Sequence, residues 1–288
     1  MRKNLLSWIE EERERAHCDG VSHPDNFPFL LAPKQPNGQA VVLVHGFGAT
    51  PRSIFPVAEA LYRQHYTVAG VRLPGHGTSP DDLKQRKATE WTATACSAYD
   101  YLTEKGLKVS CGGLSTGALV TLTLASQRPL HKLLLFSPFL QLRHHLAPYA
   151  GFLSFFVPYQ KSTVGKLESD FYYSRRPLKA IAQINLLLRD MPRILPQIQA
   201  PALMLTSTGD RTIAPGTALK LYERLGTPHK ILHVYGNNVP HVLTTAENPE
   251  LDDVLQRCLE FMNQEFISSP AIDILPAPKR PGFLRRDA

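Results

Sequence analysis

The chain has 288 residues, of which 43% are hydrophobic and 20% are charged. This composition is ordinary for a globular protein and is compatible with one large α/β domain. No run of about 18 consecutive apolar residues occurs, so a membrane-spanning helix is not expected. The net charge of +7 lies partly in the C-terminal tail, without a zinc-finger, RNP or recognition-helix pattern, so nucleic acid is not expected as a partner.

The N-terminal region is predicted to be an extension of the main domain. Residues 1–18 read as an amphipathic helix in which Leu5, Leu6 and Ile9 share one face. Residues 19–38 contain four prolines and are predicted to form a loop, so the extension covers residues 1–37. The segment lacks the features of a signal peptide, and the four cysteines are dispersed without metal-ligand spacing. A reduced, cytoplasmic protein without a metal site is therefore expected.

From residue 40 onward, short apolar runs alternate with segments of helical periodicity. Ala40 to Val44 is a continuous apolar run, as expected for a strand buried on both faces. Within the helical segment 88–105, Trp91, Ala95 and Leu102 fall on one stripe. The other predicted strands cover residues 67–71, 107–111, 132–136, 202–205 and 230–234, and the other helices cover 51–64, 116–127, 215–225 and 248–265. This order predicts a mostly parallel sheet with helices on both faces.

The alternation stops in residues 140–198, a segment rich in Phe, Tyr, Leu and Pro. This segment is predicted to be an inserted cap over the carboxyl edge of the sheet, where open α/β sheets bind ligands. The core is then expected to comprise residues 38–139 and 199–267. Residues 268–288 contain four prolines and are predicted to form an irregular basic tail.

The segment Gly113-Leu114-Ser115-Thr116-Gly117 matches the pattern G-x-S-x-G, between a predicted strand and a predicted helix. The chain must reverse within about two residues to present the serine hydroxyl above the sheet. Side chains two residues before and after the serine would crowd that reversal, which favours glycine there. The alternative interpretation is an ordinary turn between a strand and a helix. The presence of a base and an acid for Ser115 elsewhere in the chain decides between these two interpretations.

A serine hydroxyl is a weak nucleophile and needs a base that is oriented by an acid. In such folds the order along the chain is serine, acid, histidine. Asp210 directly follows the predicted strand 202–205, and His241 lies between the last predicted strand and the last helix. These two residues are predicted to complete a triad with Ser115. The alternatives are a turn or helix-capping aspartate and an ordinary surface histidine.

Two backbone amides are expected to stabilise the oxyanion that forms during acyl transfer. One is the amide of Thr116, which follows the nucleophile, and the other is the amide of Phe47, in the glycine-rich turn after the first core strand. His45 precedes the serine in the chain and is predicted to be structural, as is His76 in its own glycine- and proline-rich loop.

These motifs together resemble one group of α/β-hydrolases, the monoacylglycerol lipases and bacterial carboxylesterases. The resemblance runs from about residue 38 to 265. It is carried by Val42-Leu-Val-His-Gly-Phe-Gly48, Leu73-Pro-Gly-His-Gly-Thr78, Gly113-Leu-Ser-Thr-Gly117, Gly209-Asp210 and His241.

The resemblance implies an α/β-hydrolase fold with a cap and the hydrolysis of monoacylglycerols or short- to medium-chain esters, without a cofactor. It implies Ser115 as the nucleophile, Asp210 and His241 as its partners, and Phe47 and Thr116 as oxyanion donors. Ala118 and Pro240 depart from the residues that are common in the group, and Pro240 bears on the geometry of the histidine loop.

The apolar residues of the predicted cap favour a hydrophobic acyl chain as the substrate partner. Leu146, Phe152, Phe155 and Phe156 are predicted to line the acyl pocket, and the alternative is that they only pack the cap onto the core.

Other functions remain open at this stage. A thioesterase, an amidase or a carbon–carbon bond hydrolase would use the same triad, and an inactive binding protein would share the fold. A peripheral membrane contact through the N-terminal helix and the basic tail is a further hypothesis, and the oligomeric state is left open.

Overall fold

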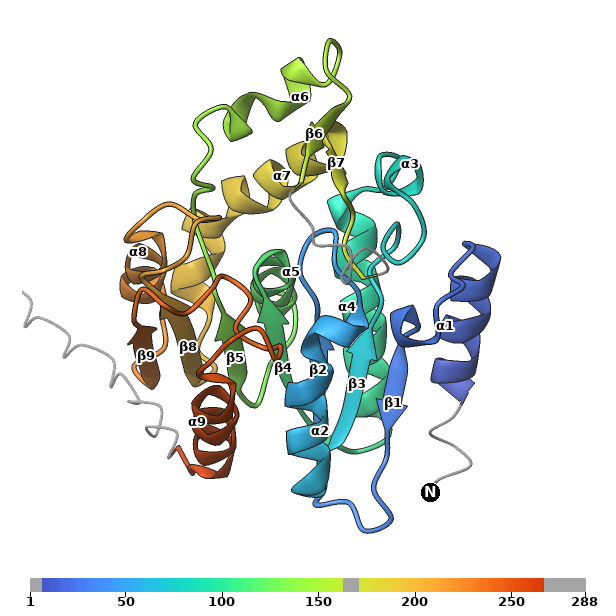
Figure 1. Ribbon diagram of the computed structural model, residues 1–288. Helices are drawn as coiled ribbons and strands as arrows, with labels where there is room; N and C mark the ends of the chain where they lie inside the picture. The colour runs from blue at the N-terminus through green and yellow to red at the C-terminus, as the bar shows by residue number, and fades with distance from the viewer. Residues whose placement is uncertain (1–6, 163–170, 267–288) are drawn as a thin grey trace, which may run out of the picture.

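The computed structural model describes residues 7–162 and 171–266. A seven-stranded sheet of order β1-β3-β2-β4-β5-β8-β9 forms its centre (Figure 1). Its strands are β1 (Phe29–Leu31), β2 (Gln39–Val44), β3 (Thr67–Val71), β4 (Lys108–Leu114), β5 (Leu133–Phe136), β8 (Ala202–Ser207) and β9 (Lys230–Tyr235). Only β1 pairs antiparallel in this sheet, and every other neighbouring pair is parallel. The predicted mostly parallel sheet is confirmed.

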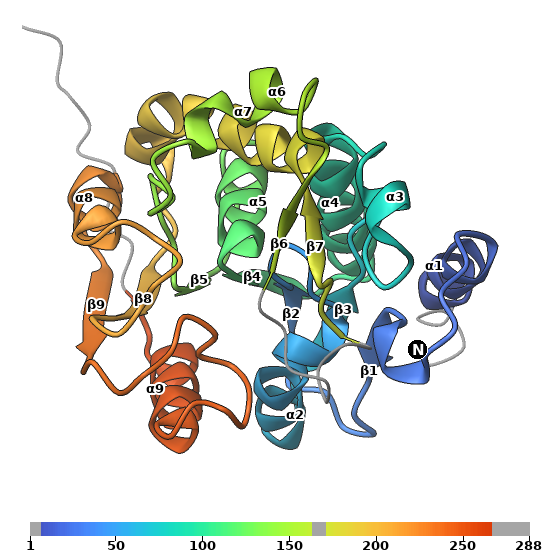
Figure 2. The same ribbon diagram turned by 45° about the horizontal axis from the view of Figure 1, so that its top comes forward.

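Helices cover both faces of the sheet, as predicted (Figure 2). One layer contains α4 (Ala88–Glu104), α5 (Thr116–Ala125) and α7 (Leu178–Ile194), and the other contains α2 (Phe55–Arg63) and α9 (Leu251–Asn263). Strand β2 shows how one apolar run serves both layers. Val42 and Val44 join the buried cluster on the α4 side, and Val41 and Leu43 join the cluster on the α2 side, because successive side chains of a strand point to opposite faces. The helix α8 (Thr217–Arg224) packs beside β9.

The N-terminal region differs from its prediction in one respect. Strand β1 lies in the segment that was predicted to be a loop, and it pairs with β3 at the edge of the sheet. An edge strand uses only one side for hydrogen bonds, so the prolines at 28 and 33 do not prevent it from pairing.

The predicted N-terminal helix is present as α1 (Ser7–Cys18), and it packs against the domain. Trp8 and Ile9 are each only 5% exposed, and the Trp8 ring stacks on Tyr101 of α4. Leu5 and Leu6 lie outside the described residues, as does the predicted tail 268–288. Within the described ranges, no helix combines the length and the apolarity that crossing a bilayer requires.

The chain between β5 and β8 rises above the carboxyl ends of the strands before it returns through α7 (Figures 1 and 2). This excursion contains α6 (Ala150–Leu153) and an antiparallel pair, β6 (Tyr159–Lys161) and β7 (Arg175–Pro177), which was not predicted. Arg175 and Tyr159 both bond to Asp81 of α3 (Pro80–Leu83), which ties the pair to the core. Helix α7 packs on α4 and α5, so its residues belong to the helical layer of the core as well.

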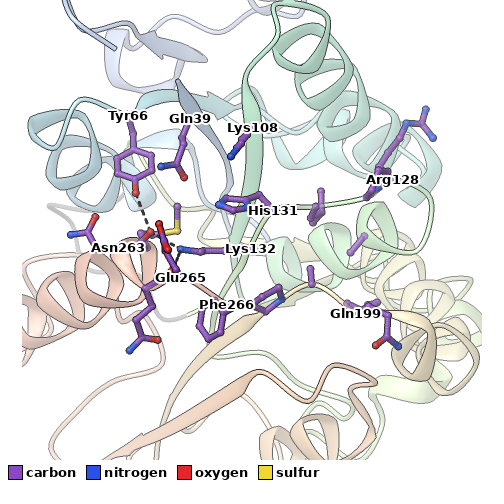
Figure 3. A pocket seen from close by; sticks show the side chains of 18 of the residues that line it. Gln39, Tyr66, Lys108, Arg128, His131, Lys132, Gln199, Asn263, Glu265 and Phe266 are labelled. Carbon is purple, nitrogen blue, oxygen red and sulfur yellow. Dashed lines mark hydrogen bonds between the residues drawn. The ribbon is translucent and has the colours of Figure 1, made fainter. Parts of the chain in front are cut away.

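A hollow lies at the opposite edge of the sheet, where the strands begin (Figure 3). Lys132 is almost fully buried there, and its ammonium donates hydrogen bonds to the carbonyl oxygens of Phe261, Met262 and Gln264, at 3.3, 2.6 and 2.6 Å. Tyr66 donates to the carbonyl of Met262 as well. The last carbonyls of a helix have no hydrogen-bond partner within the helix. The Lys132 ammonium and the Tyr66 hydroxyl supply those partners and so hold the C-terminal end of α9 against the sheet.

Candidate active site

Ser115 occupies a strained turn between β4 and α5. Its φ of 56° and ψ of −117° lie in a region that side-chain-bearing residues seldom adopt. The turn is tight enough that a Cβ on Gly113 would lie 2.3 Å from the backbone of Gly117, and a Cβ on Gly117 would lie 2.3 Å from the carbonyl oxygen of Val44. Glycine is therefore required at both positions, which gives the G-x-S-x-G pattern its physical cause.

Ser115, His241 and Asp210 form one continuous chain of hydrogen bonds. The Oγ of Ser115 lies 2.8 Å from Nε2 of His241, and Nδ1 of His241 bonds to Oδ2 of Asp210. Because the carboxylate accepts the Nδ1 proton, Nε2 is left as the acceptor for the serine hydroxyl. The three residues come from the carboxyl ends of β4, β8 and β9, which the parallel sheet brings to one edge. The structure thus brings together the three residues that the sequence predicts as a triad.

Asp210 lies in a turn that keeps its carboxylate ionised. Its side chain is 3% exposed, and its second oxygen accepts hydrogen bonds from the amides of Thr212 and Ile213, at 2.7 and 3.1 Å. Burial alone would raise the pKa of the carboxyl group. The bond to His241 and the two amides outweigh that effect, so the pKa of Asp210 lies below its usual value. An ionised Asp210 can both orient His241 and stabilise its protonated form.

The loop that carries His241 is held in place by the strands beneath it. The Ser137 hydroxyl, at the end of β5, donates to the carbonyl oxygen of His241 at 2.6 Å. Ser207, at the end of β8, donates to the carbonyl of Val239. The loop crosses Gly209 so closely that a Cβ there would lie 2.4 Å from the Asn237 carbonyl oxygen. The close approach of the histidine loop explains why a glycine precedes Asp210. The same loop accommodates Pro240.

Phe47 and Thr116, whose amides are the predicted oxyanion donors, line the same cavity as Ser115. Thr116 is the first residue of α5, where an amide has no acceptor within the helix. Phe47 follows β2, in the turn that contains His45. Both residues therefore lie at the edge of the sheet that carries Ser115, and their role as oxyanion donors stays a prediction.

The two loop histidines lie in the core rather than in the cavity wall. His45 is fully buried, accepts a hydrogen bond from the Leu73 amide at Nε2, and bonds the Gly46 carbonyl through Nδ1. His76 packs against the rings of His45, Phe47 and Trp91. Burial lowers the pKa of His45 well below its usual value and lowers the pKa of His76 to about 4. Both rings are thus neutral, and neither reaches the triad through a hydrogen bond in the described structure.

A cavity of about 1140 Å³ opens above Ser115, between the sheet edge and the segment 140–198. Leu146, one of the residues predicted to line an acyl pocket, lines this cavity together with Leu153, Leu178 and Ile181, which the sequence did not single out. Such a wall suits an apolar chain.

Phe152, Phe155 and Phe156 do not line the described cavity, and this part of the prediction is corrected. They are 67%, 81% and 72% exposed and lie on the outer side of the excursion, where the Phe152 and Phe156 rings contact each other at 5.5 Å. The short α6 turns Ala150 and Leu153 toward the cavity and α7, so its remaining apolar residues face outward.

The cavity also has a charged wall that no pattern in the sequence indicates. Arg143, Arg176 and Arg211 line it, with Glu247 as the one acidic residue among its described lining residues. These arginines are scattered through the chain, and no motif marks them. Nowhere in the described ranges, the cavity included, is a group of three His, Cys, Asp or Glu side chains arranged to hold a metal ion.

Comparison with known proteins agrees with this geometry. Residues 35–245 match a hydrolase family described as serine aminopeptidase, S33. The chain belongs to this family.

Curated relatives of the chain are ester hydrolases by name. It is 29% identical over 227 residues to the thermostable monoacylglycerol lipase of Bacillus sp. (strain H-257), covering 77% of this chain and 89% of that one. It is 24% identical over 231 residues to a carboxylesterase of Bacillus subtilis (strain 168), covering 78% and 93%. A solved structure from work on LipS and LipT, two metagenome-derived lipolytic enzymes, has a TM-score of 0.74 at 26% identity, covering 83% of this chain and 98% of that one. The predicted α/β-hydrolase fold is confirmed.

Proposed function

We propose that this protein hydrolyses carboxylic esters through an acyl-enzyme intermediate on Ser115. The observation that carries the proposal is the hydrogen-bond chain from Ser115 through His241 to Asp210, at the floor of a partly apolar cavity. The names of the curated relatives, a monoacylglycerol lipase and a carboxylesterase, support an ester as the substrate.

The proposed reaction has two acyl-transfer steps. Ser115 Oγ attacks the ester carbonyl carbon while His241 Nε2 takes the hydroxyl proton, and the amides of Phe47 and Thr116 stabilise the oxyanion. The bond to the alcohol then breaks, and the alcohol leaves with the proton held by His241. Water then attacks the carbonyl carbon of the acyl-enzyme while His241 Nε2 takes a proton from it. The bond to Ser115 Oγ breaks as His241 returns that proton to the serine, which releases the carboxylic acid.

The charge of the cavity bears on the choice between ester and peptide substrates. An aminopeptidase must bind the protonated amino terminus of its substrate, for which an acidic wall is suited. The described lining instead has three arginines against Glu247. This balance disfavours a cationic substrate and supports an ester over an amino-terminal peptide.

The proposal is tested by the hydrolysis of p-nitrophenyl esters from acetate to palmitate, with alanine p-nitroanilide as the amide counterpart. The wild-type protein should turn over some of the esters, and Ser115→Ala should reduce that turnover to the background rate. The anilide should react far more slowly than the best ester. Equal ester turnover by Ser115→Ala, or faster turnover of the anilide, would reject the proposal.

A further inference from the structure

Arg176 faces the cavity from a position that the β6–β7 pair fixes. Its strand partner is Gln160, which also lines the cavity, and side chains directly opposite in an antiparallel pair share a face. Arg175, the residue before it, points to the other face, where it bonds to Asp81 and lies 4.4 Å from the centre of the Tyr159 ring. The two adjacent arginines thus have different surroundings.

The guanidinium of Arg176 has no hydrogen-bond, ion-pair or ring partner in the parts of the chain that the structure describes. The side chain is half-buried, and this burial lowers the pKa of its guanidinium. It remains charged at neutral pH even so, because an arginine titrates far above that range. The buried Arg72, in contrast, bonds to Asp19 and to the His76 carbonyl. A cation that is withdrawn from water without a counter-charge is unfavourable, unless a ligand supplies the charge.

The other charged groups at the cavity strengthen the positive potential around Arg176. Arg143 and Arg211 are exposed, and Arg143 donates to the backbone carbonyl of Asp210 rather than to a carboxylate. Glu247 is exposed and has no ion pair with any of the three arginines. Next to Arg176 along the chain, Leu178 and Ile181 supply an apolar wall. The cavity therefore combines apolar surface with a net positive charge.

We propose that Arg176 binds an anionic group of the substrate, a carboxylate or a phosphate, so that the preferred esters are acyl esters that carry one such anionic group. The planar guanidinium fork matches both anions with two parallel hydrogen bonds. This inference rests on the proposed ester hydrolysis and narrows its substrate class. Arg176 acts here as a specificity-determining residue and takes no part in the bond-breaking steps.

The test compares esters in matched pairs that differ by one anionic group. Ethyl octanoate and monoethyl suberate place the charge at the end of an eight-carbon acyl chain. A monodecanoylglycerol and its glycerol phosphate analogue place the charge on the alcohol. The kcat/KM of each ester is measured by titration of the acid released, for the wild-type protein and for Arg176→Gln, Arg176→Lys and Lys161→Gln. Lys161 is the control, because it is an exposed cation on the same strand pair and does not line the cavity.

The wild-type protein should prefer the charged member of at least one pair, and the pair concerned identifies the end of the substrate that Arg176 binds. Arg176→Gln should lower kcat/KM for that ester by about 10- to 100-fold, the usual effect of losing a charge-assisted hydrogen bond. It should leave the neutral ester within about two-fold, Arg176→Lys should retain part of the preference, and Lys161→Gln should retain all of it.

A wild-type preference for the neutral member of both pairs would overturn the inference. So would an equal loss on both members in Arg176→Gln while that variant still reacts with a neutral fluorophosphonate at the wild-type rate, which shows that the triad is intact. Turnover of the neutral esters that depends on Ser115 would leave the proposed function standing in either case. Failure to hydrolyse any ester would instead reject the proposed function.

Discussion

At the scale of single residues, the site depends on a backbone reversal that only glycines permit. Ser115 keeps its strained conformation because α5 starts immediately after it and lies hard against the end of β2. At this contact Gly117 packs against backbone atoms, the carbonyl oxygens of Val44 and His45. Backbone atoms have no rotamer by which they could give way, so an added carbon would push α5 off the sheet.

Replacement of Gly117 by alanine should therefore disrupt both stability and the site. Its Cβ would lie 2.3 and 2.5 Å from two carbonyl oxygens, and we expect a loss of more than about 2 kcal/mol of unfolding free energy from this overpacking. The rate of fluorophosphonate labelling of Ser115 should fall as well. Thermal unfolding and labelling kinetics measure the two effects.

Gly151→Ala is the matched control for this prediction. Gly151 is also helical, but the nearest atom to an added Cβ there is Cβ of Ala182, at an ordinary 3.6 Å. This variant should be neutral or slightly more stable, because alanine is the better helix former. Equal stability of the two variants would contradict the account of the turn.

At the scale of elements, the C-terminal helix depends on a lysine from another part of the chain. Lys132 reaches the last carbonyls of α9 across the amino edge of the sheet, beside Phe266 (Figure 3). Its ammonium lies 5.9 and 5.6 Å from the ring centres of Phe261 and Phe266. Burial lowers the pKa of this ammonium, and the three carbonyl acceptors replace the water that it loses.

Lys132→Met should destabilise the protein by about 2 kcal/mol, since a side chain of similar length fills the space but no longer donates to the carbonyls. Chemical denaturation measures the loss, and hydrogen exchange should show faster opening of the last turn of α9 than of α5. Lys220→Met on α8 is the control, because Lys220 is exposed and should contribute little. A Lys132→Met variant as stable as the wild type would show that these hydrogen bonds do not hold the helix.

An element could be predicted where its own residues show a pattern, and could not be predicted where its structure depends on contacts with segments that are distant in the sequence. Strand β2 was predictable because it is a continuous apolar run, and helix α4 because its apolar residues repeat with the helical period; both are buried accordingly. Strand β1 was not, because its three residues are too few to show a period, and only the pairing with β3 makes them a strand. The triad residues were predictable from their order and from the strands that precede them, since parallel strands end at one edge.

In the predicted cap, the sequence does not indicate which side chains face the cavity. Between residues 149 and 157 almost every side chain is apolar, so no periodicity indicates which of them face inward. The structure turns Leu153 toward the cavity and leaves Phe155 outside. Arg175 and Arg176 are adjacent and chemically identical, and only the β6–β7 register separates the one bonded to Asp81 from the one that faces the cavity.

At the scale of the whole molecule, two buried neutral histidines link stability to pH. His76 has a pKa of about 4 in the folded protein against an ordinary value of 6.5, and the pKa of His45 is lowered in the same direction. Between these values the unfolded chain binds more protons than the folded one. The unfolding free energy is therefore highest above about pH 6.5, where these histidines are neutral in both states, and it decreases as the pH falls toward 4.

The unfolding free energy should thus fall by about 3 kcal/mol through His76 alone when the pH drops from 7 to 4, with a further loss from His45. Denaturant unfolding at a series of pH values measures the slope. The control is His145→Gln, at an exposed histidine, which should keep the wild-type slope of unfolding free energy against pH. A free energy that stays level between pH 7 and 5 would contradict the neutral state of the two rings.

The role of Ser115 as the nucleophile of an ester hydrolase is tested most directly by mass spectrometry of the protein after treatment with a fluorophosphonate. The hydrogen-bond chain to His241 and Asp210 predicts a single adduct, which peptide mapping should place on Ser115. The adduct should be absent from Ser115→Ala and should form slowly in Asp210→Asn, in which His241 loses its ionised partner. An unmodified wild-type protein, or an adduct on another residue, would contradict the account.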